Sequence, residues 1–163
     1  MARCEYPSPV GVLTLVASDD GLQCVWWPDD PRRPGSGPEQ PDHPVLARTM
    51  RQLDEYFGGT RTEFDIPLDP GGTDFQRAAW GVLRTIPYAQ TITYGEQARR
   101  LGDPAKARAA GAANGRNPLS IVVPCHRVVG AGGALTGFAG GLDTKRWLLD
   151  FERSCSERAA HHS

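Results

Sequence analysis

Alternating apolar and polar positions mark the first part of the chain as a small sheet followed by a helix. Residues 10–17 and 21–27 are rich in β-branched and aromatic side chains and flank a turn-forming run of Ser, Asp and Gly, which predicts an antiparallel hairpin. Six prolines within residues 28–44 then predict a surface loop. Apolar side chains recur at helical spacing over residues 45–57 and stop before two glycines, which predicts a helix.

The second part of the chain carries a mostly helical pattern. Thr73 and Gln76 have the spacing of a capping box, and apolar positions at helical spacing follow them up to Pro87. Residues 94–101 predict a second short helix, and residues 103–115 a third, which begins with Asp-Pro and is rich in alanine. Two short helices joined by a tight turn indicate a helix-turn-helix, a DNA-binding motif.

A short apolar run in this second part ends at a cysteine. Residues 121–123 are Ile-Val-Val, which predicts a buried strand that Pro124 ends. Cys125 and His126 follow, and a thiol with an ordinary pKa of about 8.5 becomes a nucleophile when a histidine lowers that value. Adjacent side chains on a strand point to opposite faces, so the two can cooperate only on a turn. By themselves they fit either a nucleophile with its base or two buried structural residues.

Composition predicts a cellular compartment and shows that the two parts of the chain differ in charge. The 163 residues are enough for one domain or two small ones. Residues 1–72 hold 6 basic and 12 acidic side chains, and residues 73–163 hold 12 and 7, a difference that hints at a nucleic-acid surface on the second part. Four widely spaced cysteines, and the lack of a basic segment followed by an apolar run, predict a cytoplasmic protein without a signal peptide or membrane span.

The run Pro-Cys-His-Arg-Val at residues 124–128 resembles the signature of the O6-alkylguanine-DNA alkyltransferases, also called methylated-DNA-protein-cysteine S-methyltransferases. Flanking matches at the family's spacing extend the resemblance over residues 73 to 152; they are Tyr94-Gly95, Arg108-Ala109, Asn117-Pro118, Gly140-Gly141, Lys145, Trp147 to Leu149 and Glu152.

This resemblance implies an α+β fold in two domains. Residues 1–72 would form a ribonuclease-H-like domain, a small N-terminal antiparallel sheet with a helix. Residues 73–155 would form a mostly helical, winged helix-turn-helix domain that carries the active cysteine. We expect residues 156–163 to be a flexible tail.

The activity that the resemblance implies is DNA repair by a single-turnover alkyltransferase. The alkyl group of O6-alkylguanine moves irreversibly to Cys125, one group per protein molecule and without a cofactor; O4-alkylthymine is a second candidate substrate. His126 is the expected base, acting through a water, and Glu152 orients it. Asn117 fixes the turn before Cys125, and Tyr94 gives a proton to the leaving purine.

The resemblance also implies how substrate and DNA are held. Backbone groups of Cys125, Val128 and Ala139 bind the guanine, and the ring of Phe138 packs on it. Phe138 stands where a tyrosine is usual, and the missing hydroxyl costs about 1 kcal/mol of hydrogen bonding. The partner is double-stranded DNA containing O6-alkylguanine, bound in the minor groove by a monomer. The DNA-contacting residues are Tyr94, Ala107, Arg108, which enters the base stack, Ala109 and Gly111.

Three other interpretations stay open. A DNA-binding module of the same architecture would recognise alkylated guanine without reacting. A cysteine hydrolase would use Cys125, His126 and Glu152 with turnover, and a transcriptional regulator would leave the Cys-His pair unexplained. A structural zinc is not expected, because the three scattered residues Cys4, Cys24 and His43 do not make a closed tetrahedral site.

Overall fold

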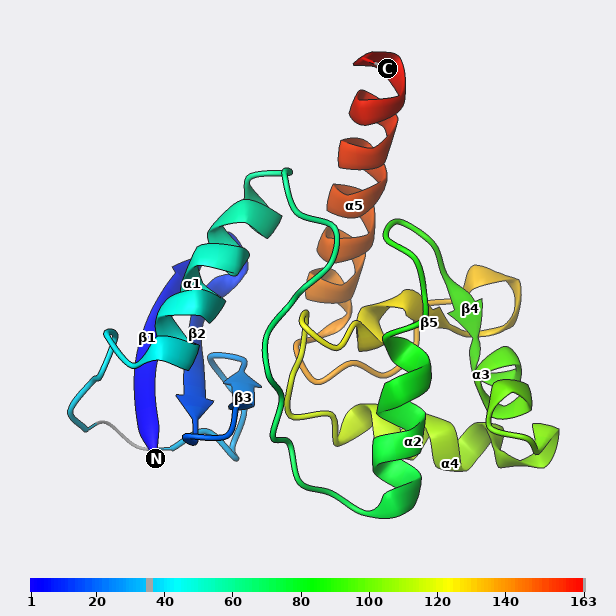
Figure 1. The fold of residues 1–163 in the computed structure, drawn as a ribbon. Coiled ribbons are helices and arrows are strands. Elements are labelled where there is room, and N and C mark those ends of the chain that lie inside the picture. Colours follow the sequence, from blue (N-terminus) through cyan, green and yellow to red (C-terminus); the bar gives the residue numbers. More distant parts are fainter. Residues whose placement is uncertain (35–36, 163) are drawn as a thin grey trace. The chain divides into compact units, whose positions relative to one another are not determined.

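The computed structural model describes residues 1–34 and 37–162, which fold as two compact units (Figure 1). The first unit contains residues 1–71 together with residues 118–122, and the second contains residues 72–117 and the chain from 123 onward. The predicted single boundary after residue 72 therefore does not account for residues 118–122. These five residues are buried and pack with the first unit, although their flanks belong to the second.

The first unit is built on a three-stranded antiparallel sheet in the order β1 (Ala2–Ser8), β2 (Gly11–Ala17), β3 (Leu22–Trp26). The β2–β3 pairing confirms the predicted hairpin. Strand β1 was not predicted, because charged residues and Pro7 interrupt its pattern. Its alternate residues are nevertheless buried, and a proline is tolerated because β1 is an edge strand.

One helix and one returning segment complete the first unit. Helix α1 (Pro44–Phe57) confirms the prediction for residues 45–57 and is anchored to β1 by the Tyr6 hydroxyl, which donates to Asp54 at 2.6 Å. Beside β3, the Val25 amide donates to the Pro118 carbonyl at 2.7 Å, and the Trp27 indole donates to the Ser120 hydroxyl at 3.0 Å. These bonds satisfy polar groups that would otherwise be buried without partners.

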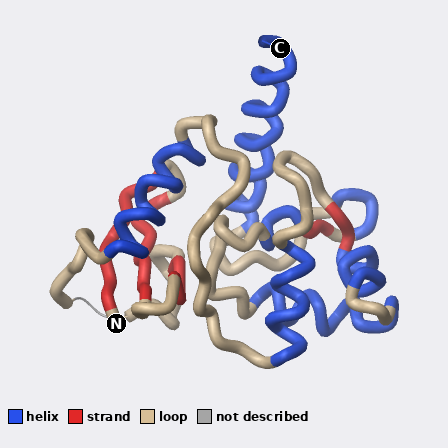
Figure 2. Tube along the Cα trace, viewed as in Figure 1, coloured by secondary structure: helices blue, strands red, loops and turns tan. Residues whose placement is uncertain are grey.

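Helices dominate the second unit (Figure 2). Its elements are α2 (Asp74–Leu83), β4 (Ile92–Thr93), α3 (Tyr94–Arg100), a 3-10 turn (Pro104–Lys106), α4 (Ala107–Gly115), β5 (Val128–Val129) and α5 (Leu142–His162). The capping box of Thr73 and Gln76 is confirmed. Helix α2 ends at Leu83, four residues before Pro87, and the chain then makes a turn that buries Ile86.

The predicted helix-turn-helix is confirmed as α3 and α4, although the expected third helix starts as a 3-10 turn. A buried pair of amides joins the two helices: the Gln97 side chain donates to Asn114 at 2.9 Å, and Asn114 donates back at 2.8 Å. The Trp80 indole of α2 donates to the Ala113 carbonyl at 2.8 Å. These paired groups fix α4 on α2 and α3, because breaking any bond would leave a buried polar group unsatisfied.

The predicted strand at residues 121–123 is wrong. The residues are buried as expected, but Ile121 has a φ of 73°, outside the extended region, and the Val122 amide donates to the Ser120 carbonyl within a tight turn. A β-branched residue rarely adopts this left-handed conformation. The run is apolar because it fills a core, and burial alone does not distinguish a strand from a buried turn.

Helix α5 continues through the residues expected to form a tail. It runs to His162, and only Ser163 of the predicted tail lies outside the described residues. The sequence from Leu142 to His162 contains neither glycine nor proline, so it contains no helix-breaking residue.

Candidate active site

The cysteine lies on a single 3-10 turn, Cys125–Arg127, which Pro124 precedes and β5 follows. The turn confirms the geometry that Cys125 and His126 need in order to cooperate. The Val123 carbonyl accepts from both the Cys125 amide, at 2.8 Å, and the Asn117 side chain, at 2.9 Å. Asn117 is buried at the end of the segment that follows α4, so it ties that segment directly to the turn carrying Cys125.

A fully buried carboxylate, Glu152 of α5, organises the other side of this turn. His126 Nε2 lies 2.7 Å from one oxygen of Glu152, and the Arg127 guanidinium makes two bonds to the carboxylate, at 2.9 and 3.0 Å. The Ala89 amide also donates to Glu152, at 3.2 Å, from a residue whose φ of 63° lies in the left-handed region. An alanine pays about 1–2 kcal/mol for that conformation. The structure thus brings His126 and Glu152 together, as the family resemblance implied.

The charge state of this cluster follows from burial and pairing. Burial lowers the pKa of His126 below its ordinary value, and Glu152 opposes this shift only in part. Burial alone would raise the pKa of Glu152, but the charges and hydrogen bonds of His126 and Arg127 outweigh it and hold that pKa well below its usual range. A neutral His126 with an ionised Glu152 and a charged Arg127 leaves no net charge in the cluster, which a buried environment favours.

Acidification is expected to destabilise the fold in two stages, because both His126 and Glu152 have lowered pKa values. An unfolded histidine takes up a proton near pH 6.5, whereas the folded His126 does so only at lower pH, so stability starts to fall near that point. The contribution of Glu152 is complete above its unfolded pKa of about 4.3 and is lost as the pH falls further. Thermal melting at a series of pH values measures both stages.

Glu157→Gln is the matched control for this measurement, because Glu157 is an exposed carboxylate on the same helix. It should follow the wild-type profile. Glu152→Gln should lose the lower stage and be less stable at neutral pH by about 3–5 kcal/mol, since Arg127 would remain buried without its counter-ion. An unchanged acid profile in Glu152→Gln would contradict the assignment.

A second buried cation, Lys145 of α5, lies on the side of the predicted base pocket. Its ammonium donates to the Thr136 carbonyl at 2.9 Å and lies 5.9 Å from the ring centre of Tyr94 and 6.0 Å from that of Phe138. Burial lowers the pKa of Lys145, and the charge of Cys125 acts in the opposite direction. Lys145 therefore links two of the predicted site residues and is electrostatically coupled to the cysteine.

The remaining predicted pocket residues have different environments. Val128 is buried in β5 and pairs with Ile92, whereas Phe138 is half-buried and Ala139 is exposed in the loop before α5. The Tyr94 hydroxyl is within 3.4 Å of the Thr136 carbonyl. Tyr94, Phe138 and Lys145 form one cluster, and His126 and Glu152 form another.

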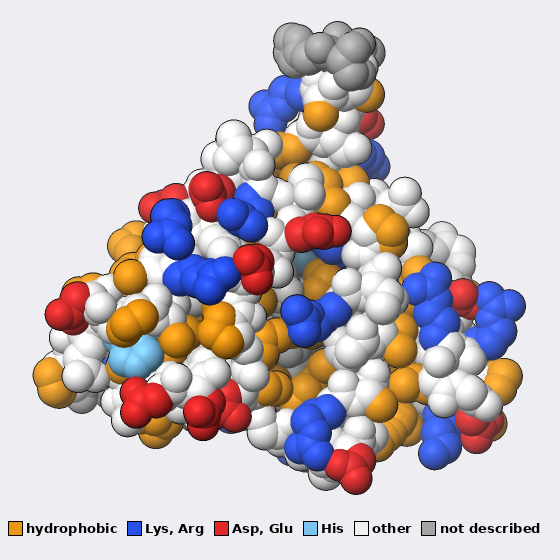
Figure 3. Space-filling model, viewed as in Figure 1, with side chains coloured by type: hydrophobic (Ala, Val, Ile, Leu, Met, Phe, Trp, Pro, Cys, Tyr) orange, Lys and Arg blue, Asp and Glu red, His pale blue; other side chains and the backbone are white. Residues whose placement is uncertain are grey.

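Four of the five predicted DNA-contacting residues lie along α4, and the fifth, Tyr94, begins α3. Arg108 and Ala109 are exposed, while Ala107 and Gly111 are half-buried. A Cβ on Gly111 would lie 3.5 Å from the Tyr94 ring, an ordinary van der Waals contact, so this ring lies next to α4 at Gly111. Lys and Arg side chains gather with a few acidic ones over the region of α3 and α4 (Figure 3), in agreement with the basic charge of the second part of the chain.

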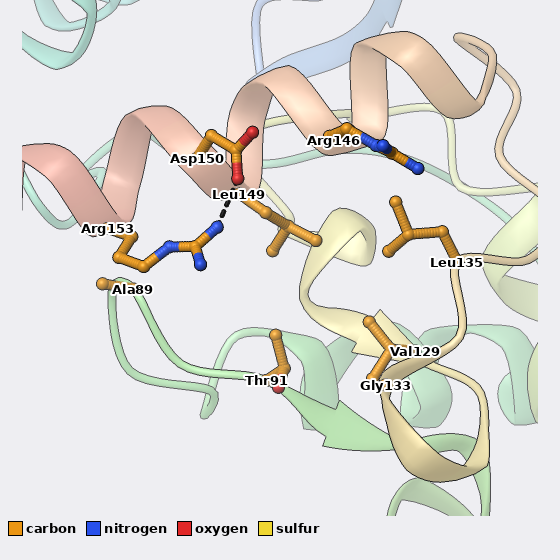
Figure 4. Close-up of a pocket in the computed structure, with 9 residues that line it drawn as sticks. All are labelled: Ala89, Thr91, Val129, Gly133, Leu135, Arg146, Leu149, Asp150 and Arg153. Atoms are coloured by element: carbon orange, nitrogen blue, oxygen red, sulfur yellow. Dashed lines mark hydrogen bonds and ion pairs between the residues drawn. The ribbon is translucent and has the colours of Figure 1, made fainter.

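A surface groove of about 520 Å³ lies between α5 and the segments that carry Ala89, Thr91 and Val129 (Figure 4). Leu149 lies between the side chains of Arg146 and Arg153, and Ala89, Thr91 and Val129 line the opposite wall. Arg153 is paired with Asp150. None of the nine residues drawn in the groove is a predicted site residue.

The described part of the chain contains neither a metal-binding cluster nor a helix that could span a membrane. No three histidine, cysteine, aspartate or glutamate side chains in residues 1–34 and 37–160 are close enough together to hold a metal ion, and this includes Cys4, Cys24 and His43. Over the same part of the chain, no helix has the length and apolar character needed to cross a membrane.

A helix-turn-helix joined to a buried thiol, imidazole and carboxylate is typical of a DNA-binding protein that carries its own nucleophile. Comparisons with known proteins identify the family. Residues 3–70 match the ribonuclease-like domain of 6-O-methylguanine DNA methyltransferases, and residues 74–154 match the DNA binding domain of the same proteins. The chain belongs to the 6-O-methylguanine DNA methyltransferase family, which confirms the resemblance and the fold class predicted from the sequence.

Individual relatives are similar over nearly their whole length. The methylated-DNA-protein-cysteine methyltransferase of Mycolicibacterium paratuberculosis is 49% identical over 90% of this chain and 88% of its own. That of Methanosarcina acetivorans is 44% identical over 92% and 97%. The crystal structure of Mycobacterium tuberculosis OGT in complex with DNA superposes with a TM-score of 0.88 at 44% identity, covering 95% of this chain and 94% of that one.

Two residues of the Glu152 cluster were not assigned a role from the sequence. Arg127 was visible only as part of the Pro-Cys-His-Arg-Val run, and Ala89 lies in a loop without a motif. The signal that could have identified Arg127 is its position beside a cysteine and a histidine in an otherwise apolar, buried run, because a buried arginine needs a carboxylate.

Proposed function

We propose that this protein is a methylated-DNA-protein-cysteine methyltransferase that repairs O6-alkylguanine in DNA by moving the alkyl group to Cys125. Family membership supports the activity. The observation that carries the assignment of the nucleophile is the arrangement of His126: its Nε2 is bonded to Glu152, while among the described residues its buried Nδ1 has no hydrogen-bond partner. An imidazole held by a carboxylate on one nitrogen and unpaired on the other is suited to accept a proton.

Two of the three other cysteines, Cys4 and Cys24, differ from Cys125 in their surroundings. Burial raises the pKa of the Cys4 and Cys24 thiols to about 11, so both are protonated at neutral pH. No histidine neighbours either of them along the chain. Since the thiolate is the reactive form of cysteine, Cys125 with its adjacent base is the favoured nucleophile.

In the proposed reaction, the thiol of Cys125 gives its proton through one water to Nδ1 of His126. The thiolate then attacks the alkyl carbon, so that the sulfur–carbon bond forms as the carbon–O6 bond breaks. The electron pair of the broken bond stays on the guanine, which gains a proton from the Tyr94 hydroxyl. Tyr94 is reprotonated from water and His126 releases its proton, so no cofactor enters the balance. The thioether product has no leaving group for hydrolysis, so each molecule acts once.

We further propose that the substrate base lies between the two clusters of the second unit. The backbones of Cys125, Val128 and Ala139 would bind the guanine edge, and the half-buried ring of Phe138 would pack on its face. The ammonium of Lys145, near the rings of both Tyr94 and Phe138, favours charge developing on the leaving purine, since a buried positive charge stabilises an anion more than a neutral base. O4-alkylthymine is a second candidate substrate.

For DNA, we propose binding by α4 in the minor groove of the duplex, as a cytoplasmic monomer. The exposed Arg108 is flanked by Ala107 and Ala109, so only one long side chain projects from this part of the helix. Chemistry on O6 requires that the damaged nucleotide leave the duplex, at a cost of a few kcal/mol. Arg108 inserted into the stack would offset part of this cost. The DNA complex of the related Mycobacterium tuberculosis protein supports the choice of partner.

A non-reacting sensor of the same architecture is the alternative function. The buried pairing of His126 with Glu152 next to a cysteine argues against it, because binding alone needs no base and no nucleophile.

The test is intact and peptide mass spectrometry after mixing the protein with an equimolar duplex that carries one O6-methylguanine. We expect one methyl group on the peptide containing Cys125, saturation at one group per protein, and restored guanine in the DNA. Selective binding without a mass change would favour the sensor, and Phe138→Tyr would then show whether the missing hydroxyl limits transfer. A lack of both binding and mass change would refute the proposal.

A further inference from the structure

All four acceptor positions that Glu152 can offer are filled by donors. One oxygen accepts from the Ala89 amide at 3.2 Å and from Arg127 Nε at 2.9 Å. The other accepts from Arg127 Nη2 at 3.0 Å and faces His126 Nε2 at 2.7 Å. An ionised carboxylate has about four lone-pair sites and no proton to give, so the contact to His126 is satisfied only if Nε2 carries the hydrogen.

This arrangement decides the tautomer of His126. With the hydrogen on Nε2, a neutral imidazole has its lone pair on Nδ1. That nitrogen is the one without a hydrogen-bond partner among the described residues. By holding the hydrogen on Nε2, Glu152 therefore determines that Nδ1 is the nitrogen that can act as the base.

Arg127 is held as firmly as the carboxylate that it binds. Its third nitrogen donates to the Ile86 carbonyl at 2.9 Å, and its guanidinium lies 5.5 Å from the ring centre of Tyr88. The side chain is only 7% exposed. A guanidinium with contacts on several sides has lost most of its rotamer freedom, so its charge stays beside Glu152 in every protonation state of His126.

The charge of Arg127 bears on the proton of His126. A buried carboxylate with an imidazole as its only charged neighbour is stabilised when the imidazole becomes protonated, because an uncompensated buried charge is costly. Protonation would occupy Nδ1 and remove the base. Arg127 already neutralises Glu152 through two parallel hydrogen bonds, the strong geometry for this kind of pair, so His126 does not need to supply a proton.

We propose that Arg127 is a positioning residue for the transfer reaction: it keeps His126 neutral and hydrogenated on Nε2, so that Nδ1 remains available as the base. This proposal rests on the proposed function of His126. Arg127 acts through Glu152 and His126 and does not need to touch the substrate.

Other titratable groups around His126 do not replace Arg127 in this role. Lys145 of α5 also lowers the pKa of His126, as a smaller contribution than that of Arg127, but its ammonium bonds to the Thr136 carbonyl and makes no hydrogen bond to Glu152 among the described contacts. Helix α2, which also packs on the turn, carries its charges Asp74 and Arg77 in an exposed first turn. The charged groups that act on His126 are its ion-pair partner Glu152, Arg127 and Lys145. Tyr88 interacts with Glu152, Arg127 and Cys155, and Cys125 interacts with Lys145.

The test is the pH dependence of single-turnover methyl transfer in Arg127→Met, which keeps most of the side-chain volume and loses the charge. In this variant, we expect the pH below which the transfer rate falls (the acid limb of the profile) to rise by about one unit, because a nearby positive charge has been removed. At higher pH the transfer rate should recover. Arg127→Lys keeps the charge but loses the two-bond geometry, so its acid limb should stay near that of wild type while its maximal rate falls several-fold. Arg153→Met is the matched control, because it removes an exposed arginine next to Glu152 in the sequence, and it should match wild type.

Nitrogen NMR of the histidine rings in the wild-type protein reports the protonation of His126 directly and does not depend on the folding of the Arg127 variants. The protein has four histidines, so His126→Gln assigns the signal. We expect neutral His126 with its hydrogen on Nε2 at neutral pH; an imidazolium, or a hydrogen on Nδ1, would overturn the proposal. A lower maximal rate in Arg127→Met without a shift of the acid limb would also overturn it, because that is the effect of a merely structural residue. Wild-type protein that never transfers a methyl group would instead refute the proposed function.

Discussion

Cys125→Ser is expected to abolish methyl transfer while leaving affinity for methylated duplex within about twofold of wild type. A serine hydroxyl is almost fully protonated at neutral pH and is a far weaker nucleophile than a thiolate, even beside a base. The backbone of the turn should be preserved, because the 2.8 Å bond from residue 125 to the Val123 carbonyl involves only the main-chain amide. Single-turnover assays with labelled duplex, together with binding by fluorescence anisotropy, measure the two quantities separately.

Cys24→Ser is the matched control for this experiment. Cys24 is a half-buried thiol on β3, remote in sequence from the turn, and its raised pKa keeps it protonated. We expect full transfer and a stoichiometry of one methyl group per protein. Residual transfer in Cys125→Ser, or its loss in Cys24→Ser, would show that the acceptor has been misassigned.

Arg108→Ala is expected to slow transfer from duplex DNA by about tenfold to a hundredfold and to change transfer from the free O6-alkylguanine base by less than about twofold. The difference arises because only the duplex reaction requires extrusion of the nucleotide, at a cost of a few kcal/mol, and each 1.4 kcal/mol is a factor of ten in rate. Arg108 is exposed on α4 and has room to enter a groove. The measurement is the ratio of single-turnover rates on the two substrates.

Two further variants separate charge from insertion. Arg116→Ala removes an exposed arginine at the other end of α4, and it should weaken duplex binding modestly without changing the ratio of the two rates. Arg108→Lys keeps the charge and most of the length, so it should retain part of the duplex rate. Equal losses on both substrates in Arg108→Ala would contradict a role in extrusion.

The sequence predicted the elements whose local signals agree with their packing. The capping box at Thr73 opens α2, the glycines after Phe57 follow the end of α1, and Asp103 caps the turn before α4. Strand β1 was missed because its partner β2 supplies the pairing that its own composition does not suggest. The apolar run at residues 121–123 was assigned to a strand because periodicity records burial and not φ, and only the structure reveals the left-handed Ile121.

Site residues that are adjacent in the sequence were easier to predict than those that are far apart in it. Cys125 and His126 are adjacent, so elementary thiol chemistry already suggested them. Glu152 lies 26 residues beyond His126, and only the family resemblance connected the two. The hydrogen bonds from Arg127 and Ala89 to the Glu152 carboxylate depend on how α5, the 3-10 turn and the loop before β4 pack together. No sequence motif predicts that packing.

Residues 118–122 pack with the first unit, and this affects how the chain folds and where it can be cut. Trp27 and Ser120 bond across 93 residues of sequence, so the first unit cannot be completed until most of the chain has been synthesised, and contacts of this range slow folding. A fragment that starts at residue 72 would retain every residue of the proposed site. It would nevertheless expose Leu119 and Ile121, which are about 1% exposed in the whole chain, three to five residues before the proline that precedes the nucleophile. The two units are interleaved in sequence, so the chain enters the reactive turn directly from a segment that packs with the first unit.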